Sequence, residues 1–217
     1  MAPCSIPSAI WARRNHALVL GGFAEVSVET SKDLIGGGAK IMLARAIEAQ
    51  GGVAEDEFKR LYKAMLGFYE QNNAVHTAPY PGVREVLAEL AAMDVRVAVV
   101  TNKFEAFARN VLTQLDLIDT FETVIGGDSM GKGPDGQFLA KPHPAPVLAA
   151  REALGGGRFV FIGDSTYDVR AAKAAGVPVI AAAYGYCDRP PHELGADGVI
   201  DSFSDLIPAL AALQPSA

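Results

Sequence analysis

The fold is decided by the stretch RFVFIGDSTYD, residues 158–168, in which an apolar run ends in a group of polar residues. The run at 158–162 is typical of a buried strand, because it is short, apolar and rich in aromatic and aliphatic residues. Parallel sheets place their chemistry at the carboxyl ends of their strands. The stretch therefore predicts an α/β fold with a polar site just after this strand.

Further apolar runs lie on both sides of this stretch, at residues 95–100, 124–125, 177–183 and 198–200. Helical spacing of apolar residues separates them, for example between Phe104 and Leu115. Near-continuous apolar strands that alternate with helices indicate a parallel sheet covered on both faces. This pattern predicts a Rossmann-like core.

The N-terminal third shows a different pattern. Apolar residues recur at helical spacing between Phe58 and Tyr69 and again between Ile41 and Ile47, with no strand-like alternation. The turn-forming segment APYPG, residues 78–82, separates the two patterns. We therefore expect an α-helical domain at residues 1–77 and the Rossmann-like core at 78–217.

Composition excludes several classes of protein. The chain has 217 residues, of which 50% are hydrophobic, and its 25 acidic and 19 basic residues give a net charge of −6. This balance argues against a disordered chain and against a nucleic-acid partner, and no apolar run is long enough to span a membrane. Two cysteines, Cys4 and Cys187, cannot form a disulfide scaffold, so a reducing cytoplasm is the expected compartment.

Residues 1–24 contain no acidic residue and include Arg13 and Arg14, which leaves a transit peptide as one interpretation. An ordinary helix that ends at Gly21-Gly22 is favoured, because the apolar residues step at helical spacing and the segment is not rich in serine.

Polar residues that could carry chemistry follow two of the strands and precede one helix. They are Thr101, Asn102, Lys141, Asp164 and Asp168. Carboxylates suit Mg²⁺, while a hydroxyl and a lysine suit phosphate oxygens. Each residue alone has a simpler interpretation, because Thr101 and Asp164 could cap helices, Asp168 could be a solvated first-turn residue, and Lys141 could be a surface lysine. Their order and their placement at strand ends favour a common site.

Other features do not indicate a site. Residues 126–132 fit the start of a phosphate-binding P-loop, but Gly133 stands where Ser or Thr is needed, so a flexible loop followed by a turn at 134–136 is expected. The four histidines show no metal-ligand spacing, and Cys187 lies in no motif. The segment Gly36-Gly37-Gly38 is either a helix-breaking turn or a loop that approaches a substrate.

These motifs together resemble the haloacid-dehalogenase (HAD) superfamily of phosphatases. VVTNK at 99–103 is similar to its second motif, KPHP at 141–144 to its third, and the segment 163–168 to its fourth. Residues 34–39 and 79–83 resemble the helical cap of the phosphoglycolate phosphatase branch.

The resemblance implies a Mg²⁺-dependent phosphomonoester hydrolase of a small metabolite such as 2-phosphoglycolate, working as a monomer or homodimer. It implies that Thr101 and Asn102 position phosphate, that Lys141 offsets charge, and that Asp164 and Asp168 serve Mg²⁺. It also implies that Gly36, Gly37 and Gly38 approach the substrate.

One family motif is missing from the sequence. The family's first motif is a strand followed by Asp-x-Asp-Gly-Thr, whose first Asp is the nucleophile, and the chain contains no such segment. Residues 1–7 resemble the stretch that follows this motif, so we expect a start upstream of Met1 or a truncated product, and a core without its first strand. A non-catalytic phosphate-binding or regulatory homologue and a sugar phosphomutase of the same superfamily are the alternatives.

Overall fold

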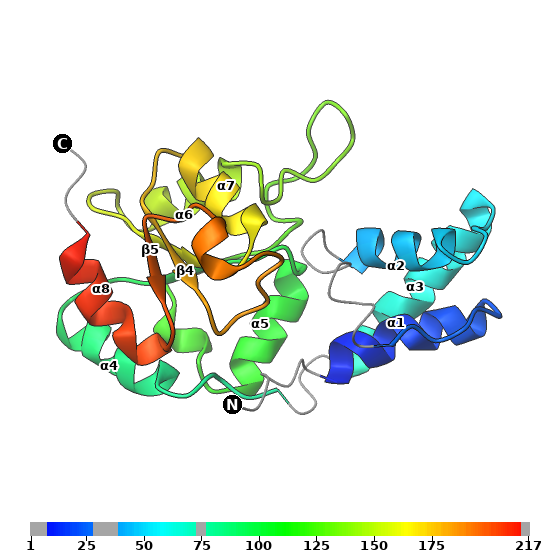
Figure 1. The fold of residues 1–217 in the computed structure, drawn as a ribbon, viewed down its shortest axis with the longest axis horizontal. Helices are drawn as coiled ribbons and strands as arrows, with labels where there is room; N and C mark the ends of the chain where they lie inside the picture. Colours follow the sequence, from blue (N-terminus) through cyan, green and yellow to red (C-terminus); the bar gives the residue numbers. More distant parts are fainter. Residues whose placement is uncertain (1–7, 28–38, 73–76, 214–217) are drawn as a thin grey trace. The chain divides into compact units, whose positions relative to one another are not determined.

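The computed structural model describes residues 8–27, 39–72 and 77–213. The chain divides into two compact units, Met1–Thr77 and Ala78–Ala217 (Figure 1). Each unit has its own buried core, so each is described by itself.

In its described part, the first unit contains helices joined by turns and loops, and no strand. Its helices are α1 (Ser8–Leu20), α2 (Ala39–Glu48) and α3 (Glu55–Asn72). The apolar stripe predicted on the third helix supplies Leu61 and Met65, which are fully buried against Leu18 of α1 and Leu43 of α2. The helical prediction for this part of the chain is confirmed.

A buried arginine in the middle of α1 ties this helix to the segment that follows it. Arg14 is fully buried, and its Nη2 donates a hydrogen bond of 2.6 Å to the carbonyl oxygen of Val26. The same guanidinium donates to Oδ1 of Asn15, which itself accepts from the Val26 amide. Burial lowers the pKa of Arg14, and its hydrogen bonds compensate in part for the lost hydration.

The second unit alternates strands with helices, as predicted. Its main elements are α4 (Val83–Ala92), β1 (Ala98–Val100), α5 (Glu105–Gln114), β2 (Thr123–Ile125), α6 (Ala145–Ala153), β3 (Phe161–Gly163), α7 (Thr166–Ala174), β4 (Val179–Ala182), β5 (Gly198–Ile200) and α8 (Leu206–Ala212). Short 3₁₀ turns, η2 (Ile118–Thr120), η3 (Pro191–Glu193) and η4 (Phe203–Asp205), complete it.

The strands form two parallel sheets within the described residues, β1–β2 and β3–β4–β5. Val99 pairs with Val124 in the first sheet, and Ile162 pairs with Ile180 in the second. The expected parallel α/β architecture is confirmed, and no hydrogen-bonded ladder between described residues joins β1 to β3.

Three strands are shorter than the sequence predicted, and one of them, β4, covers only Val179–Ala182 of the predicted run 177–183. β1 begins at Ala98 rather than at Val95, because the Val95 amide donates to Leu90 and completes the end of α4. β3 begins at Phe161 rather than at Arg158. The apolar character of 95–97 and 158–160 reflects packing rather than strand pairing, since Val97 and Val160 pack against a buried cluster.

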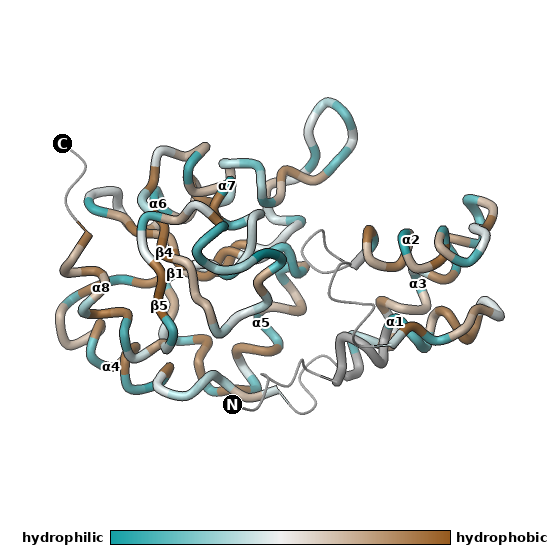
Figure 2. The backbone as a smooth tube through the Cα atoms, viewed as in Figure 1, coloured by the Kyte–Doolittle hydropathy of each residue, from teal (hydrophilic) through white to brown (hydrophobic). Residues whose placement is uncertain are grey.

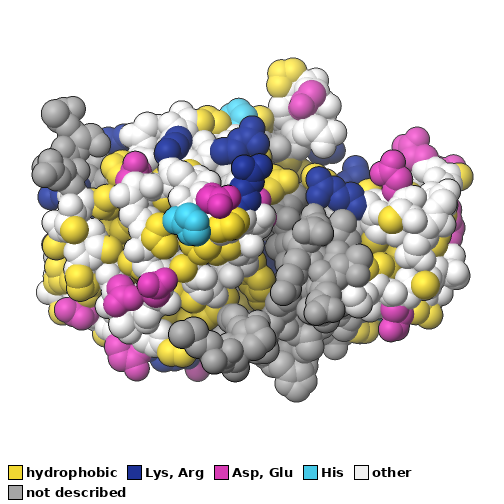
Figure 3. Space-filling model, in the orientation of Figure 1, with side chains coloured by type: hydrophobic (Ala, Val, Ile, Leu, Met, Phe, Trp, Pro, Cys, Tyr) yellow, Lys and Arg dark blue, Asp and Glu magenta, His cyan; other side chains and the backbone are white. Residues whose placement is uncertain are grey.

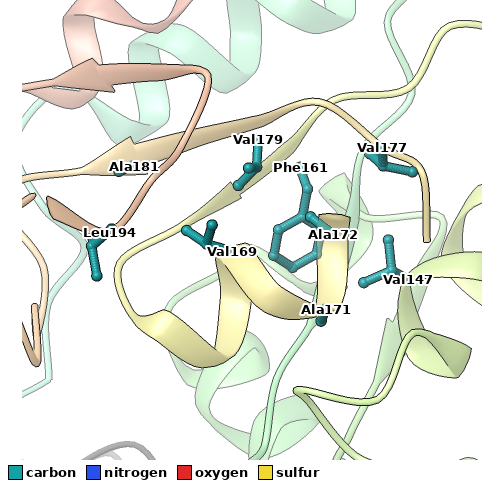
Figure 4. Close-up of a cluster of buried hydrophobic side chains, with 9 residues drawn as sticks. All are labelled: Val147, Phe161, Val169, Ala171, Ala172, Val177, Val179, Ala181 and Leu194. Atoms are coloured by element: carbon teal, nitrogen blue, oxygen red, sulfur yellow. The ribbon is translucent and has the colours of Figure 1, made fainter. Parts of the chain in front are cut away.

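Strand β4 separates the two main cores of this unit. Val179 and Ala181 face a cluster built with Val147 of α6 and Val169 of α7 (Figure 4). Ile180 points to the other face, toward α4, β5 and α8. Alternate side chains of a strand point to opposite faces, so one apolar strand supports helices on both sides. The hydropathy of the residues follows this layering, because β4 and β5 are coloured brown, as hydrophobic segments, inside the unit (Figure 2).

Truncation of Ile180 to alanine is expected to lower the free energy of unfolding by about 2–5 kcal/mol, because Ile180 is fully buried and leaves a cavity. Urea unfolding followed by circular dichroism measures the change. Val199→Ala is the control, because Val199 is 44% exposed in the neighbouring strand and should change stability by less than about 1 kcal/mol. Equal losses in both variants would contradict this assignment of the core.

The charged side chains on the surface are of both signs, as the composition indicates. On the face shown in Figure 3, basic side chains form small groups beside acidic ones rather than a continuous stripe. Among the described helices, none is both long and apolar enough to cross a membrane.

Candidate active site

The loop after β1 carries the first two predicted site residues. The Thr101 amide donates to the carbonyl oxygen of Ile125 at 2.9 Å, so the backbone of Thr101 extends the β1–β2 pairing by one residue. Its hydroxyl oxygen accepts from the Lys103 amide at 3.1 Å, which fixes the turn that leads into α5. Asn102 points toward the segment before α6, where its Nδ2 donates to the carbonyl oxygen of Lys141 at 2.9 Å.

Lys141 joins the two sheets of the second unit. Its Nζ donates to the carbonyl oxygen of Val100, at the end of β1, at 2.9 Å. The same Nζ lies 2.5 Å from Oδ1 of Asp168, in the helix after β3, and 5.6 Å from the centre of the Phe161 ring. With 11% of its side chain exposed, Lys141 is not a surface lysine.

Asp168 uses both carboxylate oxygens within the protein. Oδ1 faces Lys141, while Oδ2 accepts from the Ser165 hydroxyl at 2.6 Å and from the Ser165 and Asp164 amides. This arrangement is a capping box at the start of α7. Asp168 is buried, which by itself raises its pKa, but the charge of Lys141 and these hydrogen bonds outweigh burial and hold the pKa below the ordinary aspartate value.

Asp164 is held differently. Its Oδ2 accepts one hydrogen bond, of 2.7 Å, from the amide of Tyr186 in the loop after β4. Among the described residues, no hydrogen bond is donated to Oδ1. Burial is the main cause that raises the pKa of Asp164, and the negative charge of Asp168 adds to it. A half-buried carboxylate with one oxygen that receives no hydrogen bond can serve as a ligand of a cation.

Of the two aspartates in this network, only Asp164 has a carboxylate oxygen that could bind Mg²⁺. Among the described residues, no three His, Cys, Asp or Glu side chains come together as a metal cluster. Mg²⁺ commonly uses one or two protein carboxylates and takes its other ligands from water and phosphate. Oδ1 of Asp164 can serve as such a ligand, whereas both oxygens of Asp168 are already bonded.

Five predicted site residues thus belong to one connected network. Asn102 contacts Lys141, Lys141 contacts Asp168, and Asp168 contacts the backbone of Asp164, while Thr101 adjoins Asn102 in the chain. Gly36, Gly37 and Gly38 lie outside the described residues.

Sequence reasoning missed the residues that hold this network in place. The S-x-x-D spacing of Ser165 and Asp168 is a capping-box signal that could have been found. Tyr186 and Asp188 carry no such signal, because each lies 22 residues along the chain from its partner, Asp164 or Thr166.

The segment that partly fits a P-loop does not precede a helix. It leads into a hairpin, in which Lys132 pairs with Phe138. The predicted turn is confirmed, because the Gly136 amide donates to the carbonyl oxygen of Gly133 at 2.9 Å.

Comparison with known proteins places this network in a family. The family model described as haloacid dehalogenase-like hydrolase matches residues 8–182, which include every described residue of the network. The chain belongs to this family. Its HAD-like fold is therefore confirmed by the comparison as well as by the parallel α/β architecture.

Relatives of this HAD-family chain carry one recurrent name. A phosphoglycolate phosphatase of Rhodospirillum rubrum is 36% identical over 208 residues, which cover 93% of this chain and 83% of the relative. Another from Agrobacterium fabrum is 34% identical, with 90% and 82% covered. A crystal structure of a predicted phosphoglycolate phosphatase from Haemophilus somnus superposes with a TM-score of 0.84 at 29% identity, covering 94% and 91%. By this resemblance the chain is a HAD-type phosphatase.

Proposed function

We propose that this protein is a Mg²⁺-dependent phosphomonoester hydrolase of a small phosphorylated acid, with 2-phosphoglycolate as the leading substrate. The observation that carries the proposal is the position of Lys141, which ties the loop after β1 to the two aspartates after β3. The names of the relatives support the choice of substrate.

The two aspartates have different tasks in this proposal. Asp164 is the direct ligand of Mg²⁺ through Oδ1, because its other oxygen is already fixed by the Tyr186 amide. Asp168 serves the metal site indirectly, since it fixes the Asp164 amide and holds the charge of Lys141 in place. When bound, Mg²⁺ supplies a Lewis acid that draws charge from the phosphoryl oxygens.

The remaining residues bind and orient the phosphoryl group. The Thr101 hydroxyl can donate to one phosphate oxygen while it accepts from the Lys103 amide. Asn102 positions the segment that carries Lys141, whose charge offsets that of the phosphate. We assign the unit of residues 1–77 as the cap and Gly36–Gly38 as its substrate-facing loop.

Covalent turnover needs a nucleophile that this sequence does not contain. In the family mechanism an aspartate of the first motif attacks phosphorus, and water then hydrolyses the aspartyl phosphate. A second candidate function is that of a phosphate-binding homologue, in which the 217-residue chain binds a phosphorylated ligand without turnover.

One experiment tests both functions. Hydrolysis of 2-phosphoglycolate with Mg²⁺ is measured for residues 1–217 and for the same chain preceded by a strand that ends in Asp-x-Asp-Gly-Thr. We expect chelator-sensitive turnover of 2-phosphoglycolate only in the extended protein. A sugar phosphate is assayed in the same way as a second substrate. Turnover by the 217-residue chain would refute the binding-only function, and an inactive, folded extended protein would refute the phosphatase.

Substitution of Thr101 by valine is expected to weaken binding of inorganic phosphate by about tenfold, because one hydrogen bond to the ligand is lost while the shape is kept. Isothermal titration calorimetry measures the affinity. Thr101→Ser keeps the hydroxyl and is the matched control, for which we expect affinity within about threefold of the wild type. Unchanged affinity in Thr101→Val would remove Thr101 from the phosphate site.

The expected setting is a cytoplasmic protein that acts on a small metabolite as a monomer or homodimer.

A further inference from the structure

Helix α5 begins directly after the phosphate-binding loop, but its own residues do not cap it. Its N-cap residue, Phe104, offers no side-chain hydrogen bond. The amide of Glu105 donates instead to Oδ1 of Asp128, at 2.8 Å. Asp128 belongs to the loop after β2, so the first turn of α5 is fixed by a residue from the neighbouring strand.

Helix α7, after the metal-binding loop, has its own capping box but also receives hydrogen bonds to its first residue from a distant loop. The Thr166 amide donates to Oδ1 of Asp188 at 2.8 Å, and the Thr166 hydroxyl donates to Oδ2 at 2.5 Å. Asp188 belongs to the loop after β4, which again is the strand that pairs with the one leading into the helix. The same loop supplies the Tyr186 amide that binds Asp164.

A glycine in each of these loops lies close against a site residue. A Cβ atom at Gly127 would lie 2.6 Å from the carbonyl oxygen of Asn102. A Cβ atom at Gly185 would lie 2.3 Å from Cβ of Asp164 and 2.4 Å from its Oδ2. Neither glycine adopts a positive φ, so what excludes a side chain there is space and not backbone conformation.

The two arrangements are equivalent in topology. β1 pairs in parallel with β2, and β3 pairs in parallel with β4. In each pair the first strand leads into a site loop and a helix, and the loop after the second strand contributes a glycine and an aspartate. The loops after parallel neighbours emerge at the same sheet edge, so residues distant in sequence can fix one another there.

We propose that these loops are positioning devices for the two halves of the active site, with separate effects on its two ligands. The first clamp, Gly127 and Asp128, sets the position of Thr101 and Asn102 and thereby the phosphate site. The second clamp, Gly185 and Asp188, sets the direction of the Asp164 carboxylate and thereby the cation site. The inference rests on the proposed function, because it assigns phosphate to the first loop and the metal to the second.

A purely structural role would have another signature. If the clamps only stabilised the fold, their loss would lower stability and weaken the binding of both ligands together. A positioning role instead predicts that loss of one clamp weakens the binding of one ligand and leaves the other unchanged, because each clamp touches one half of the site. Residues that orient metal ligands typically contribute about 10–100-fold to metal affinity.

The experiment measures two probes on the 217-residue chain, Mn²⁺ by electron paramagnetic resonance and inorganic phosphate by calorimetry without metal. Gly185→Ala and Asp188→Ala are expected to weaken Mn²⁺ binding about tenfold or more and to leave phosphate binding within about twofold. Gly127→Ala and Asp128→Ala are expected to do the reverse. Gly198→Ala is the matched control, because a Cβ there meets only Ile180 Cγ1, at 3.7 Å, and both affinities should be unchanged.

The outcomes separate this inference from the proposed function. A wild-type chain that binds neither probe contradicts the proposed site, and the inference fails with it. Wild-type binding combined with equal losses of both ligands in every folded clamp variant contradicts the inference alone. If a glycine variant fails to fold, Asp188→Ala decides for the second clamp, since Asp188 is exposed. Asp128→Ala decides for the first clamp, since Asp128 is only half-buried.

Discussion

Replacement of Lys141 by methionine is expected to lower the free energy of unfolding by about 3–5 kcal/mol, because it leaves the buried Asp168 carboxylate without its positive partner. The substitution also breaks the link between Val100 and the helix after β3, so phosphate binding should be lost as well. Urea unfolding at neutral pH measures the stability, and calorimetry with inorganic phosphate measures the binding.

Two comparisons test the reason for this loss. Lys59→Met removes a cation from an ion pair whose members are 63% and 82% exposed, and it should change stability by less than about 1 kcal/mol. In the double variant Lys141→Met, Asp168→Asn the uncompensated charge is gone, so part of the stability should return. A loss in Lys141→Met no larger than that in Lys59→Met would show that the pair is not buried in solution.

The pair also predicts the response to acid. The pKa of Asp168 is lowered in the folded protein, so the folded state holds fewer protons than the unfolded state at intermediate pH. The stabilisation is therefore fully present above the ordinary aspartate pKa and is lost as the pH falls through the folded value. Lys141→Met should remove this acid-dependent part of the stability.

Asp164→Asn is expected to abolish detectable binding of Mn²⁺ or Mg²⁺ and, in the same protein, to raise stability in the absence of metal. The pKa of Asp164 is raised, chiefly by burial, so the folded state retains a proton that the unfolded state has already lost. Stability then falls as the pH rises from the ordinary value through the raised value, and a neutral asparagine avoids this cost. Thermal unfolding with and without Mg²⁺ measures both effects.

Asp168→Asn is the matched control for this prediction, four residues further along the same motif. The pKa of Asp168 is shifted in the opposite direction, so its replacement should destabilise the metal-free protein at neutral pH. The two substitutions should therefore change the stability of the metal-free protein in opposite directions. Retained metal binding in Asp164→Asn would refute Asp164 as the ligand, and a loss of stability in both variants would refute the assigned pKa directions.

Much of the fold could be predicted because hydrophobic patterning reports local structure. The stripe on α3 and the apolar run of β4 were found from their period and length. The starts of β1 and β3 were not, because the residues before them are apolar for packing reasons and make no ladder bonds.

The candidate site was predicted in part for a related reason. Thr101 and Asp164 could be found because each directly follows a strand, and in a parallel sheet such positions converge. The division of work between Asp164 and Asp168 could not, because it depends on which oxygen meets which donor.

By itself the sequence determined the order of strands and helices, the two-unit division as a hypothesis, the family resemblance and the identity of the polar residues at the strand ends. Only the tertiary structure decided that Lys141 joins two sheets, that Asp168 is saturated while Asp164 keeps one oxygen, and that Asp128 and Asp188 fix helices from other loops. The physical reason is the distance along the chain over which each interaction acts. Hydrophobic period and capping act within a few residues, whereas burial, charge pairing and close backbone approach depend on segments that only the folded sheet brings together.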